Sequence, residues 1–330
     1  MGLGSCGAGI VVALLLTSPR IDAQPVTGVE LALRCDFDAG ESYAYDLYRS
    51  STEFEHGQSV SSSVARTPFT VTVLDRTAED LRLDWEFGKP EVLELSGHAE
   101  AARASGIGSL VEEVVSQPMR FVTRSDVQLS ALSLENGASF VRELEAQMRA
   151  VMDVALEPLQ GRDEMQPVLE QVKATVAQFV GNRQIVEAIT LEYPTMILSL
   201  ACGTYRVGEP EVLSGHFVNP FGGAPLPSRG TRQVTVLDRA AGFAVIDTQQ
   251  APVAAEAARI FEQTLIGSAA QLNITPAQVK TLAASVELRE RMRSTIELAS
   301  GWPTSQVHDR EMTVIMRKRT VEKTEFKQRD

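Results

Sequence analysis

The stretch Val71-Thr72-Val73-Leu74-Asp75-Arg76 returns unchanged as Val234-Thr235-Val236-Leu237-Asp238-Arg239, 163 positions further along the chain. Six consecutive identities are not expected by chance, so we interpret the chain as carrying a duplicated module. Further identical pairs occur at the same offset: Gly40 and Gly203, Ser51 and Ser214, Phe54 and Phe217, Arg66 and Arg229, Ala78 and Ala241, and Asp84 and Asp247. The first copy therefore extends at least over 40–84. A duplication predicts architecture and leaves the chemistry open.

Apolar and polar residues alternate on both sides of the first hexapeptide, which predicts half-buried antiparallel strands between 29 and 87. The apolar positions of this alternation are Tyr43, Tyr45, Leu47, Leu81, Leu83, Trp85 and Phe87. Another strand segment is expected over 119–134. Helical spacing predicts helices over 98–115, 163–180, 183–191 and 254–269, and one that Ser139 caps and that runs to about 156. Thr275-Pro276-Ala277-Gln278 is a capping box that begins a further helix.

The second copy is expected to begin with a strand over 195–202. Residues 219–228 are rich in Pro and Gly and predict a loop, with the Ser-rich stretch 59–63 as its counterpart in the first copy. A closing hairpin is expected from a strand over 295–298, the turn Ser300-Gly301-Trp302-Pro303 and a strand over 310–326. The basic residues of that last strand predict a sheet edge that faces water; they are Arg310, Arg317, Lys318, Arg319 and Lys323.

These segments together predict an α+β fold: two tandem repeats of an antiparallel β-meander, with helices packed on one side of curved sheets. The expected division is a secretory signal peptide over 1–23, a first strand-rich module with a helical insertion over 24–190, and a second, duplicated strand-rich module over 191–330.

The N-terminus has the pattern of a secretory leader. Residues 7–16 form a ten-residue apolar run, and Ile21-Asp22-Ala23 is a small-residue cleavage site, although no basic residue precedes the run. Cleavage near Ala23 predicts a periplasmic or secreted bacterial protein. A buried helix or an incorrect start codon is the alternative. No segment reaches the roughly 20 apolar residues of a membrane span, so no membrane span is expected.

Removal of the leader leaves two cysteines, Cys35 and Cys202, in the matching contexts Leu31-Ala32-Leu33-Arg34-Cys35 and Leu198-Ser199-Leu200-Ala201-Cys202. In an oxidising compartment they are a candidate disulfide, which would close a long loop and stabilise the fold by about 4 kcal/mol. Two separately buried thiols are the alternative, because the sequence does not show that the two residues meet.

Net charge, composition and the absence of known motifs limit the kinds of ligand and chemistry that the sequence predicts. The formal charge of -12 disfavours nucleic acid, and the 44% hydrophobic content is that of a globular chain with a sizeable core. The histidines, His56, His98, His216 and His308, lack the spacing of metal ligands, and no Gly-x-Ser-x-Gly nucleophile turn or phosphate loop occurs. The sequence therefore predicts no catalytic, cofactor-binding or metal-binding residues and no cofactor.

The repeated carboxylates Asp75 and Asp238 are interpreted as turn residues that hydrogen-bond local backbone and pair with Arg76 and Arg239. They would form a symmetric acid/base pair only if the two copies faced each other across a cleft.

Several short features together resemble a group of uncharacterised exported bacterial proteins: the leader, Gly40 to Tyr43, the two Val-x-Val-Leu-Asp segments, Leu134-Glu135-Asn136, and Ser300-Gly301-Trp302-Pro303. The resemblance implies an envelope location and no particular activity. The leading hypothesis is a non-enzymatic protein that binds an apolar ligand, such as a lipid, or an envelope protein. The alternatives are a structural or assembly factor that acts through sheet edges, and a hydrolase in which a histidine lies beside a carboxylate and a nucleophile.

Overall fold

β-Strands dominate the computed structural model, which describes residues 28–104, 118–126, 129, 132–156, 170, 183–217, 219, 224–272, 274–314 and 318–329. The strands are β1 (Glu30–Ala32), β2 (Ser42–Glu55), β3 (Gln58–Arg76), β4 (Asp80–Phe87), β5 (Glu91–Gly97), β6 (Met119–Asp126), β7 (Leu132–Leu134), β8 (Thr204–Arg206), β9 (Glu211–Phe217), β10 (Leu226–Asp238), β11 (Phe243–Pro252), β12 (Glu287–Glu297), β13 (Pro303–Val314) and β14 (Lys318–Gln328). The helices are α1 (His98–Ala104), α3 (Gly137–Leu156), α5 (Arg183–Thr190), α6 (Glu192–Leu198), α7 (Ala254–Leu272) and α8 (Pro276–Ser285).

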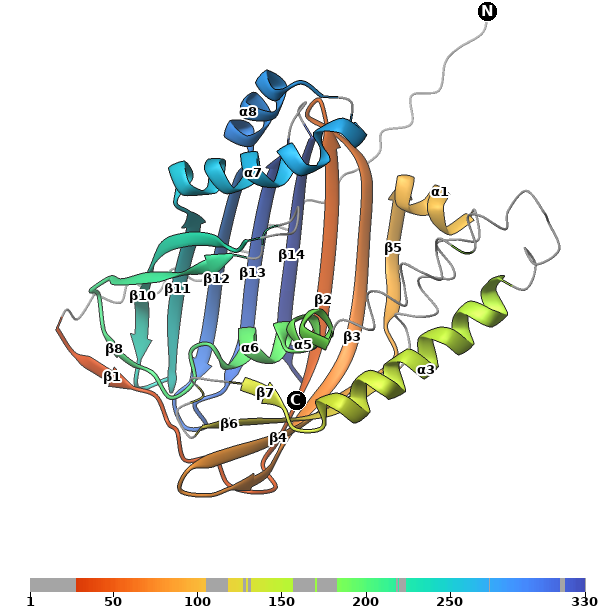
Figure 1. Cartoon of the computed structure of the whole chain (residues 1–330). Coiled ribbons are helices and arrows are strands. Elements are labelled where there is room, and N and C mark those ends of the chain that lie inside the picture. The colour runs from red at the N-terminus through yellow and green to blue at the C-terminus, as the bar shows by residue number, and fades with distance from the viewer. Residues whose placement is uncertain are drawn as a thin grey trace, which may run out of the picture.

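The expected α+β fold, with two tandem repeats of an antiparallel β-meander and helices packed on one side of curved sheets, is wrong, because the structure is mostly β-strand. Twelve strands form one antiparallel sheet in the order β7-β6-β4-β3-β2-β14-β13-β12-β11-β10-β9, with β5 paired to β3, and β1 and β8 form a small second sheet (Figure 1). Strands from both halves of the chain belong to this sheet because β14 pairs with β2 along 11 residue positions, 318–328. Both strands are then satisfied on both edges, which two isolated sheets could not achieve.

The inner face of the sheet, defined by the side chains of Tyr45, Phe69 and Phe326, carries the main core. Its rings stack in a row: the Tyr45 and Phe69 centroids lie 5.1 Å apart, and those of Phe69 and Phe87 lie 5.0 Å apart. On β4 the buried residues Leu81, Leu83, Trp85 and Phe87 recur at every second position, which places them on this face. Helices α5 and α6 cross this face in the middle of the sheet (Figure 1).

Helices α7 and α8 cross the same face near one end of the strands, at the top of Figure 1. Here Phe261 of α7 and Val279 of α8 are buried in a second cluster with Leu288 of β12. Thr275 caps α8, and the reciprocal hydrogen bonds of the predicted capping box join it to Gln278. The helices α6, α7 and α8 therefore leave a stretch of the inner face between them uncovered.

Several local predictions are confirmed. Helices α5 and α7 occur where helical spacing predicted them, and the turn Ser300-Gly301-Trp302-Pro303 joins β12 to β13. Trp302 is 1% exposed and stacks on Tyr43 at 4.5 Å. Gly301 has φ 75°, and a Cβ there would lie 2.7 Å from the carbonyl oxygen of Arg34, so only glycine fits this turn without displacement.

Other local predictions are wrong. The strand expected over 195–202 is absent: 195–198 belong to α6, and 199–202 form a turn. Both Ile197 and Leu198 of the helix are buried in the main core. The Ser-rich stretch 59–63 belongs to β3, and the hairpin turns at His56 and Gly57 instead. Helix α3 begins at Gly137, and the Ser139 hydroxyl donates to the Asn136 carbonyl.

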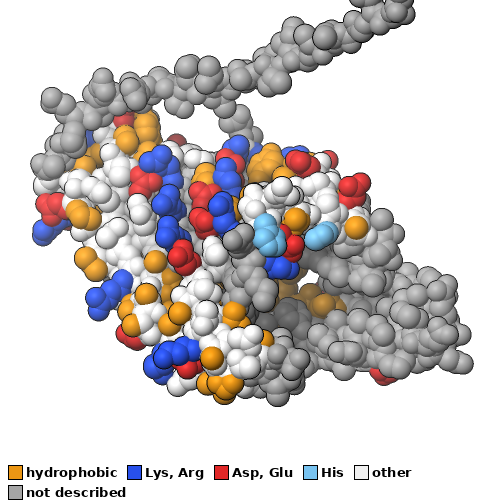
Figure 2. All heavy atoms as spheres, turned by 90° about the horizontal axis from the view of Figure 1, so that it is seen from above, with side chains coloured by type: hydrophobic (Ala, Val, Ile, Leu, Met, Phe, Trp, Pro, Cys, Tyr) orange, Lys and Arg blue, Asp and Glu red, His pale blue; other side chains and the backbone are white. Residues whose placement is uncertain are grey.

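The expected edge strand over 310–326 is two central strands, β13 and β14. Their basic side chains face acidic partners across the strands, as between Arg319 and Glu311 (3.1 Å) and between Lys318 and Glu55 (2.8 Å). Figure 2 shows such basic and acidic side chains side by side. Charge compensation across strands, and not an exposed edge, accounts for them.

The leader over 1–23, the helix over 163–180, the later part of the helix over 98–115, Arg317 and most of the loop over 219–228 lie outside the described residues. Residues 226–228 of that loop belong to β10. None of the helices that the structure describes is both long enough and apolar enough to cross a membrane.

Candidate functional site

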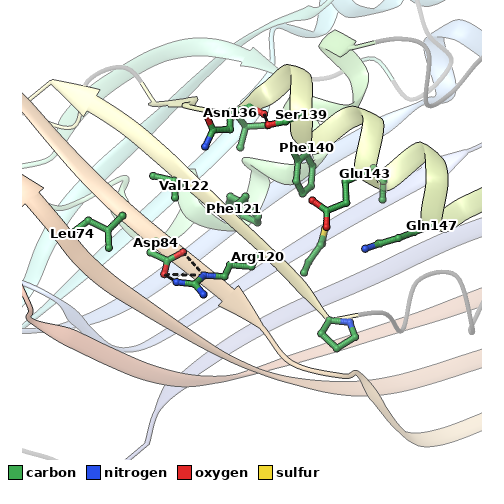
Figure 3. A pocket seen from close by; sticks show the side chains of 14 residues that line it. Leu74, Asp84, Arg120, Phe121, Val122, Asn136, Ser139, Phe140, Glu143 and Gln147 are labelled. Atoms are coloured by element: carbon green, nitrogen blue, oxygen red, sulfur yellow. Dashed lines mark hydrogen bonds and ion pairs between the residues drawn. The ribbon is translucent and has the colours of Figure 1, made fainter.

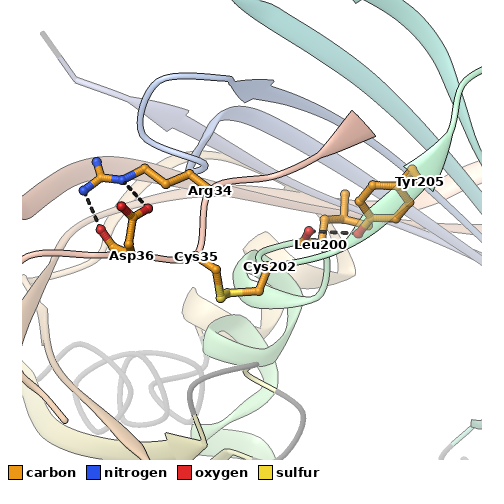
Figure 4. Close-up of a disulfide and its surroundings, with 6 residues drawn as sticks. All are labelled: Arg34, Cys35, Asp36, Leu200, Cys202 and Tyr205. Atoms are coloured by element: carbon orange, nitrogen blue, oxygen red, sulfur yellow. Dashed lines mark hydrogen bonds and ion pairs between the residues drawn. A yellow bond between two sulfur atoms is a disulfide. The ribbon is translucent and has the colours of Figure 1, made fainter. Parts of the chain in front are cut away.

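Cys35 and Cys202 are joined in a disulfide, with their Cα atoms 4.6 Å apart (Figure 4). The bond connects the segment that leads into β2 with the segment that follows α6. Beside it, β1 pairs with β8, and the Tyr205 hydroxyl donates to the Leu200 carbonyl at 2.8 Å. Three of the leucines that flank the two cysteines, Leu31, Leu33 and Leu200, lie in one core cluster. The disulfide fits an oxidising compartment.

The first candidate site is a pocket of about 520 Å³ between the first half of α3 and β6 (Figure 3). Its apolar side is formed by Met119, Phe121, Leu134, Phe140 and Leu144. The rings of Phe121 and Phe140 meet edge to face at 5.7 Å, which fixes α3 against the strand.

The rim of this α3 pocket is polar. Glu143 and Gln147 lie one helical turn apart on α3, and Asn136 and Ser139 stand at its beginning. At the opposite rim Arg120 binds the carboxylate of Asp84 through two nitrogens, at 3.1 Å and 2.7 Å (Figure 3). An apolar wall with polar groups along its rim suits a ligand that is itself amphiphilic.

The second candidate site follows from strand register. One row of residues points from six neighbouring strands, β3 to β11, to the inner face between α6 and α8. We call this row the polar belt; it consists of Ser63, Ser51, Glu322, Arg310, Glu290 and Gln250. On the inner face, Leu47 and Phe326 lie four residues along their strands from the belt residues Ser51 and Glu322. In the opposite direction, Leu288 and Met312 lie two residues from Glu290 and Arg310. The belt is a polar interruption between two apolar zones.

Part of the polar belt lines a pocket of about 290 Å³, the belt pocket, against which α6 places Glu192 and Tyr193. Arg310 lies at its centre: its Nε is 2.6 Å from Glu290, and its Nη1 is 3.8 Å from Glu322 and 4.0 Å from Glu192. The guanidinium of Arg49 lies 5.6 Å from the centroid of the Tyr193 ring.

Burial alone would raise the pKa of Glu290, but the hydrogen bond from His308 and the charge of Arg310 outweigh it, and the net shift is downward. Glu290 is therefore ionised at neutral pH although its side chain is only 16% exposed. Burial raises the pKa of Tyr193 to about 12, so its hydroxyl stays protonated and can donate.

The four histidines lie in three places. The Lys318 ammonium lowers the pKa of Glu55, and His98 and His56 act on Glu55 in the same direction, so these two histidines share one end of the sheet. His216 lies on β9. His308 lies 3.6 Å from Glu290 in the belt pocket, which also contains Ser51 and Ser63. Within the described part of the chain, His308 makes no hydrogen bond to a serine, and no cluster of His, Cys, Asp and Glu suits a metal ion.

The repeated aspartates do not form a pair. Asp75 is the second-last residue of β3, and Asp238 is the last residue of β10. In the sheet β2, β14, β13, β12 and β11 lie between these two strands. Asp238 accepts a hydrogen bond from the Ala241 backbone at 2.8 Å, as expected of a turn residue. In the first copy Thr77 caps the turn instead, through the Asp80 backbone at 3.0 Å. The expected ion pairs with Arg76 and Arg239 do not occur among the described residues.

No family model matches the chain, and no curated protein matches it significantly. Among solved structures, it is similar to a protein of Bacteroides fragilis with a YmcC-like fold, described as exported, at 4% identity and a TM-score of 0.21 over 91% of this chain and 100% of that one. An outer membrane channel of Pseudomonas putida matches at 8% identity and a TM-score of 0.23, covering 89% and 97% of the two chains. Omp33 of Acinetobacter baumannii matches at 6% identity and a TM-score of 0.18, covering 88% and 100%. TM-scores this low do not define a shared fold.

The sequence pattern does not identify the residues of the polar belt. It predicts that Arg310 lies on a sheet edge that faces water, and it gives no role to Glu290 or Glu322. Alternation within each strand would have placed them on one face, but strand order and register, which bring them together, were not available from the sequence.

Proposed function

We propose that this chain is an exported, non-enzymatic binding protein whose α3 pocket holds the apolar part of an amphiphilic ligand such as a lipid. The observation that carries the proposal is the pocket itself. Its volume of about 520 Å³ is within the range of small-molecule sites, and the edge-to-face rings of Phe121 and Phe140 give it an aromatic wall.

The polar rim supports an amphiphile over a plain hydrocarbon. The carboxylate of Glu143 and the amide of Gln147 stand where the head of a ligand would emerge, and the Asp84–Arg120 pair faces them. A ligand with hydroxyl or amine groups at one end would exchange its hydrogen bonds with water for hydrogen bonds with this rim.

The test is extraction of the purified full chain with organic solvent, followed by mass spectrometry of the extract. We expect a co-purifying lipid in the wild type and its loss from Leu144→Glu, which places a charge on the apolar wall. Ala146→Glu, on an exposed position of the same helix, is the matched control and should retain the lipid. An extract without lipid, or one that both variants leave unchanged, would refute the proposal.

Export is supported by two features, the leader pattern over 1–23 and the Cys35–Cys202 disulfide. Expression of the full gene in a Gram-negative host, followed by fractionation and mass determination, should yield a periplasmic or secreted chain beginning near Gln24. A cytoplasmic chain with residues 1–23 intact would contradict this.

We also infer that the modules over 24–190 and 191–330 arose by duplication. Strand order supports this: β2-β3-β4-β6-β7 and β9-β10-β11-β12-β13 each follow the sheet in chain order. The hexapeptides occupy β3 and β10, the second strand of each series.

An assembly factor is the second candidate, and the free edge of β9 favours it. This strand pairs only with β10 among the described residues, and Val212 on it is 75% exposed. An extended segment of an envelope protein could add to this edge as a further strand. Val212→Lys should abolish capture of such a partner from envelope fractions without loss of folding; equal capture by both forms would exclude this edge.

A further inference from the structure

We propose that the belt pocket is a second binding site, separate from the α3 pocket, and that it takes a neutral, polyhydroxylated ligand of the saccharide class. It is built from β2, β3, β13, β14 and α6, whereas the α3 pocket is built mainly from α3 and β6. No residue lines both pockets, so either site can be tested without altering the other.

The polar belt lies where the fold would otherwise place core. The inner face carries Leu47 and Phe326 two rows to one side of the belt and Leu288 and Met312 in the row on its other side, and these apolar rows pack under α6 and α8. Glu290 and Arg310 are only 16% and 34% exposed, and charges this far removed from water cost free energy unless they are paired and hydrogen-bonded. Apolar residues at such positions often give equal or greater stability, so folding alone does not account for these two charges.

A solvated sheet face would be the simplest reason, but the geometry disfavours it. The side chains of His308 and Glu290 are only 12% and 16% exposed, and α6 brings Glu192 and Tyr193 over the strands to form a wall. Side chains that merely face water do not need a wall. Here His308, Arg310 and Glu322 line one cavity of about 290 Å³, and Glu290 pairs with Arg310.

The charges of this cavity exclude three ligand classes. The guanidinium groups of Arg49 and Arg310 line it together with the carboxylates of Glu192 and Glu322, and Glu290 pairs with Arg310. An anion would meet the carboxylates, and a cation would meet the two guanidinium groups. An apolar ligand would strip water from all of them without replacing its hydrogen bonds.

A neutral ligand with many hydroxyl groups avoids each of these costs, because every hydroxyl both donates and accepts. The cavity offers matching groups of both kinds. Arg49 has a planar array of donors held over the Tyr193 ring, and Glu322 offers carboxylate acceptors. The hydroxyls of Ser51, Ser63 and Thr324 line the floor and can act either way. Hydrogen bonds to the charged groups would be the stronger ones.

The test is isothermal titration calorimetry on the full chain with its disulfide intact. The neutral probes are maltose, cellobiose and N,N′-diacetylchitobiose, and inorganic phosphate and spermidine are the anionic and cationic comparisons. We expect at least one disaccharide to bind with a millimolar or tighter Kd, and neither ion to bind at this site. Glu322→Gln, which keeps the shape of the side chain, should weaken that binding about tenfold, as should Arg49→Ala.

Glu311→Gln is the matched control, because Glu311 lies on β13 next to Arg310 and points to the opposite face of the sheet, where it pairs with Arg319. It should leave saccharide affinity unchanged. Thermal unfolding shows whether each variant is folded. If Glu322→Gln or Arg49→Ala fails to fold, the affinity of the other variant tests the proposal. The proposal is overturned if none of the three disaccharides binds, if phosphate or spermidine binds with the sensitivity expected of the saccharide, or if the belt variants bind as the control does.

Discussion

The hairpins β3–β4 and β10–β11 contain the same hexapeptide and use it differently. Val71 and Val73 are 0% and 1% exposed in the first hairpin, but in the second only Val234 (1%) is buried to that degree. The first hairpin packs in an aromatic cluster around Trp85, and the second in an aliphatic one around Ile246. Identical local sequence therefore fixed the extended backbone in both places and did not fix the surroundings.

The register of the two hairpins differs as well. Asp84 lies opposite Thr72, whereas Asp247 lies opposite Gln233, which is two positions before the residue that corresponds to Thr72. A shift of two residues keeps every side chain on its original face, while a shift of one would turn the apolar set outward. Both aspartates consequently still bind an arginine of the next strand along the sheet.

The largest expected difference between the hairpins is at Trp85 and its counterpart Thr248. Trp85 is fully buried, and its Nε1 donates to Thr123 at 2.9 Å, so Trp85→Ala should lower the free energy of unfolding by about 5 kcal/mol. Thr248→Ala should cost less than about 1 kcal/mol, because the Thr248 hydroxyl has no hydrogen-bond partner. Urea denaturation measures both, and equal losses would show that the two cores are equivalent.

The disulfide joins the segment before β2 to the segment after α6, so its removal should destabilise both hairpins together. We expect the double variant Cys35→Ser, Cys202→Ser to lose about 4 kcal/mol, mainly because the unfolded chain regains the freedom of a long loop. Hydrogen exchange of β4 and β11 would report each hairpin separately. Loss of protection in one hairpin alone would mean that the copies unfold independently.

The ion pairs of Asp84 and Asp247 should show a smaller difference in the loss of unfolding free energy. Asp84→Asn should cost about 2 kcal/mol and Asp247→Asn about 1 kcal/mol, because their side chains are 9% and 24% exposed and exposure weakens such pairs. Urea denaturation at neutral pH compares them.

The ion pair of Asp247 also predicts a pH dependence. Burial alone would raise the pKa of Asp247, but hydrogen bonds from Arg293 and Thr235 lower it below the ordinary 3.8. A carboxyl with a depressed pKa stabilises the fold above its unfolded pKa, and that contribution is lost as the pH falls through the folded value. Asp247→Asn should therefore flatten the stability curve below about pH 4; an unchanged curve would contradict the assignment.

The two hairpin turns should show the smallest difference in the loss of unfolding free energy. Asp238→Ala removes the hydrogen bond to the Ala241 backbone and should cost about 1 kcal/mol, whereas Asp75→Ala should be nearly neutral. In the first turn Thr77→Ala should have the effect that Asp238→Ala has in the second. Thermal unfolding of the three variants measures this, and a larger loss for Asp75→Ala would reverse the assignment.

Sequence reasoning succeeded where the deciding contacts are local. The alternation around Tyr45 and Trp85 predicted strands, and Thr275 and Gln278 predicted the start of α8, because both signals depend on residues a few positions apart. It failed at 192–198, where the apolar pair Ile197 and Leu198 suits a strand or a helix equally well. Packing of Tyr193 against Phe326, at 6.0 Å, selects the helix.

The candidate sites were less predictable than the fold. The matching contexts of Cys35 and Cys202 pointed to their disulfide, but nothing in the sequence pointed to the α3 pocket, whose walls come from residues as far apart as Asp84 and Gln147. The polar belt needs the register of five strand pairs. One misplaced pair would separate Arg310 from Glu290 and leave a different set of charges in the cavity.

By itself, the sequence determined the repeated hexapeptide, the extended backbone around it, the capped helix and the equivalent cysteines, because each depends on chain neighbours or on simple identity. Only the tertiary structure decided that the two hexapeptides lie in one sheet, that the basic strands at the C-terminus are central, and that polar side chains from six strands form one row between α6 and α8. Strand order and register are set by which apolar faces bury each other, and that choice is made by residues distant in the chain.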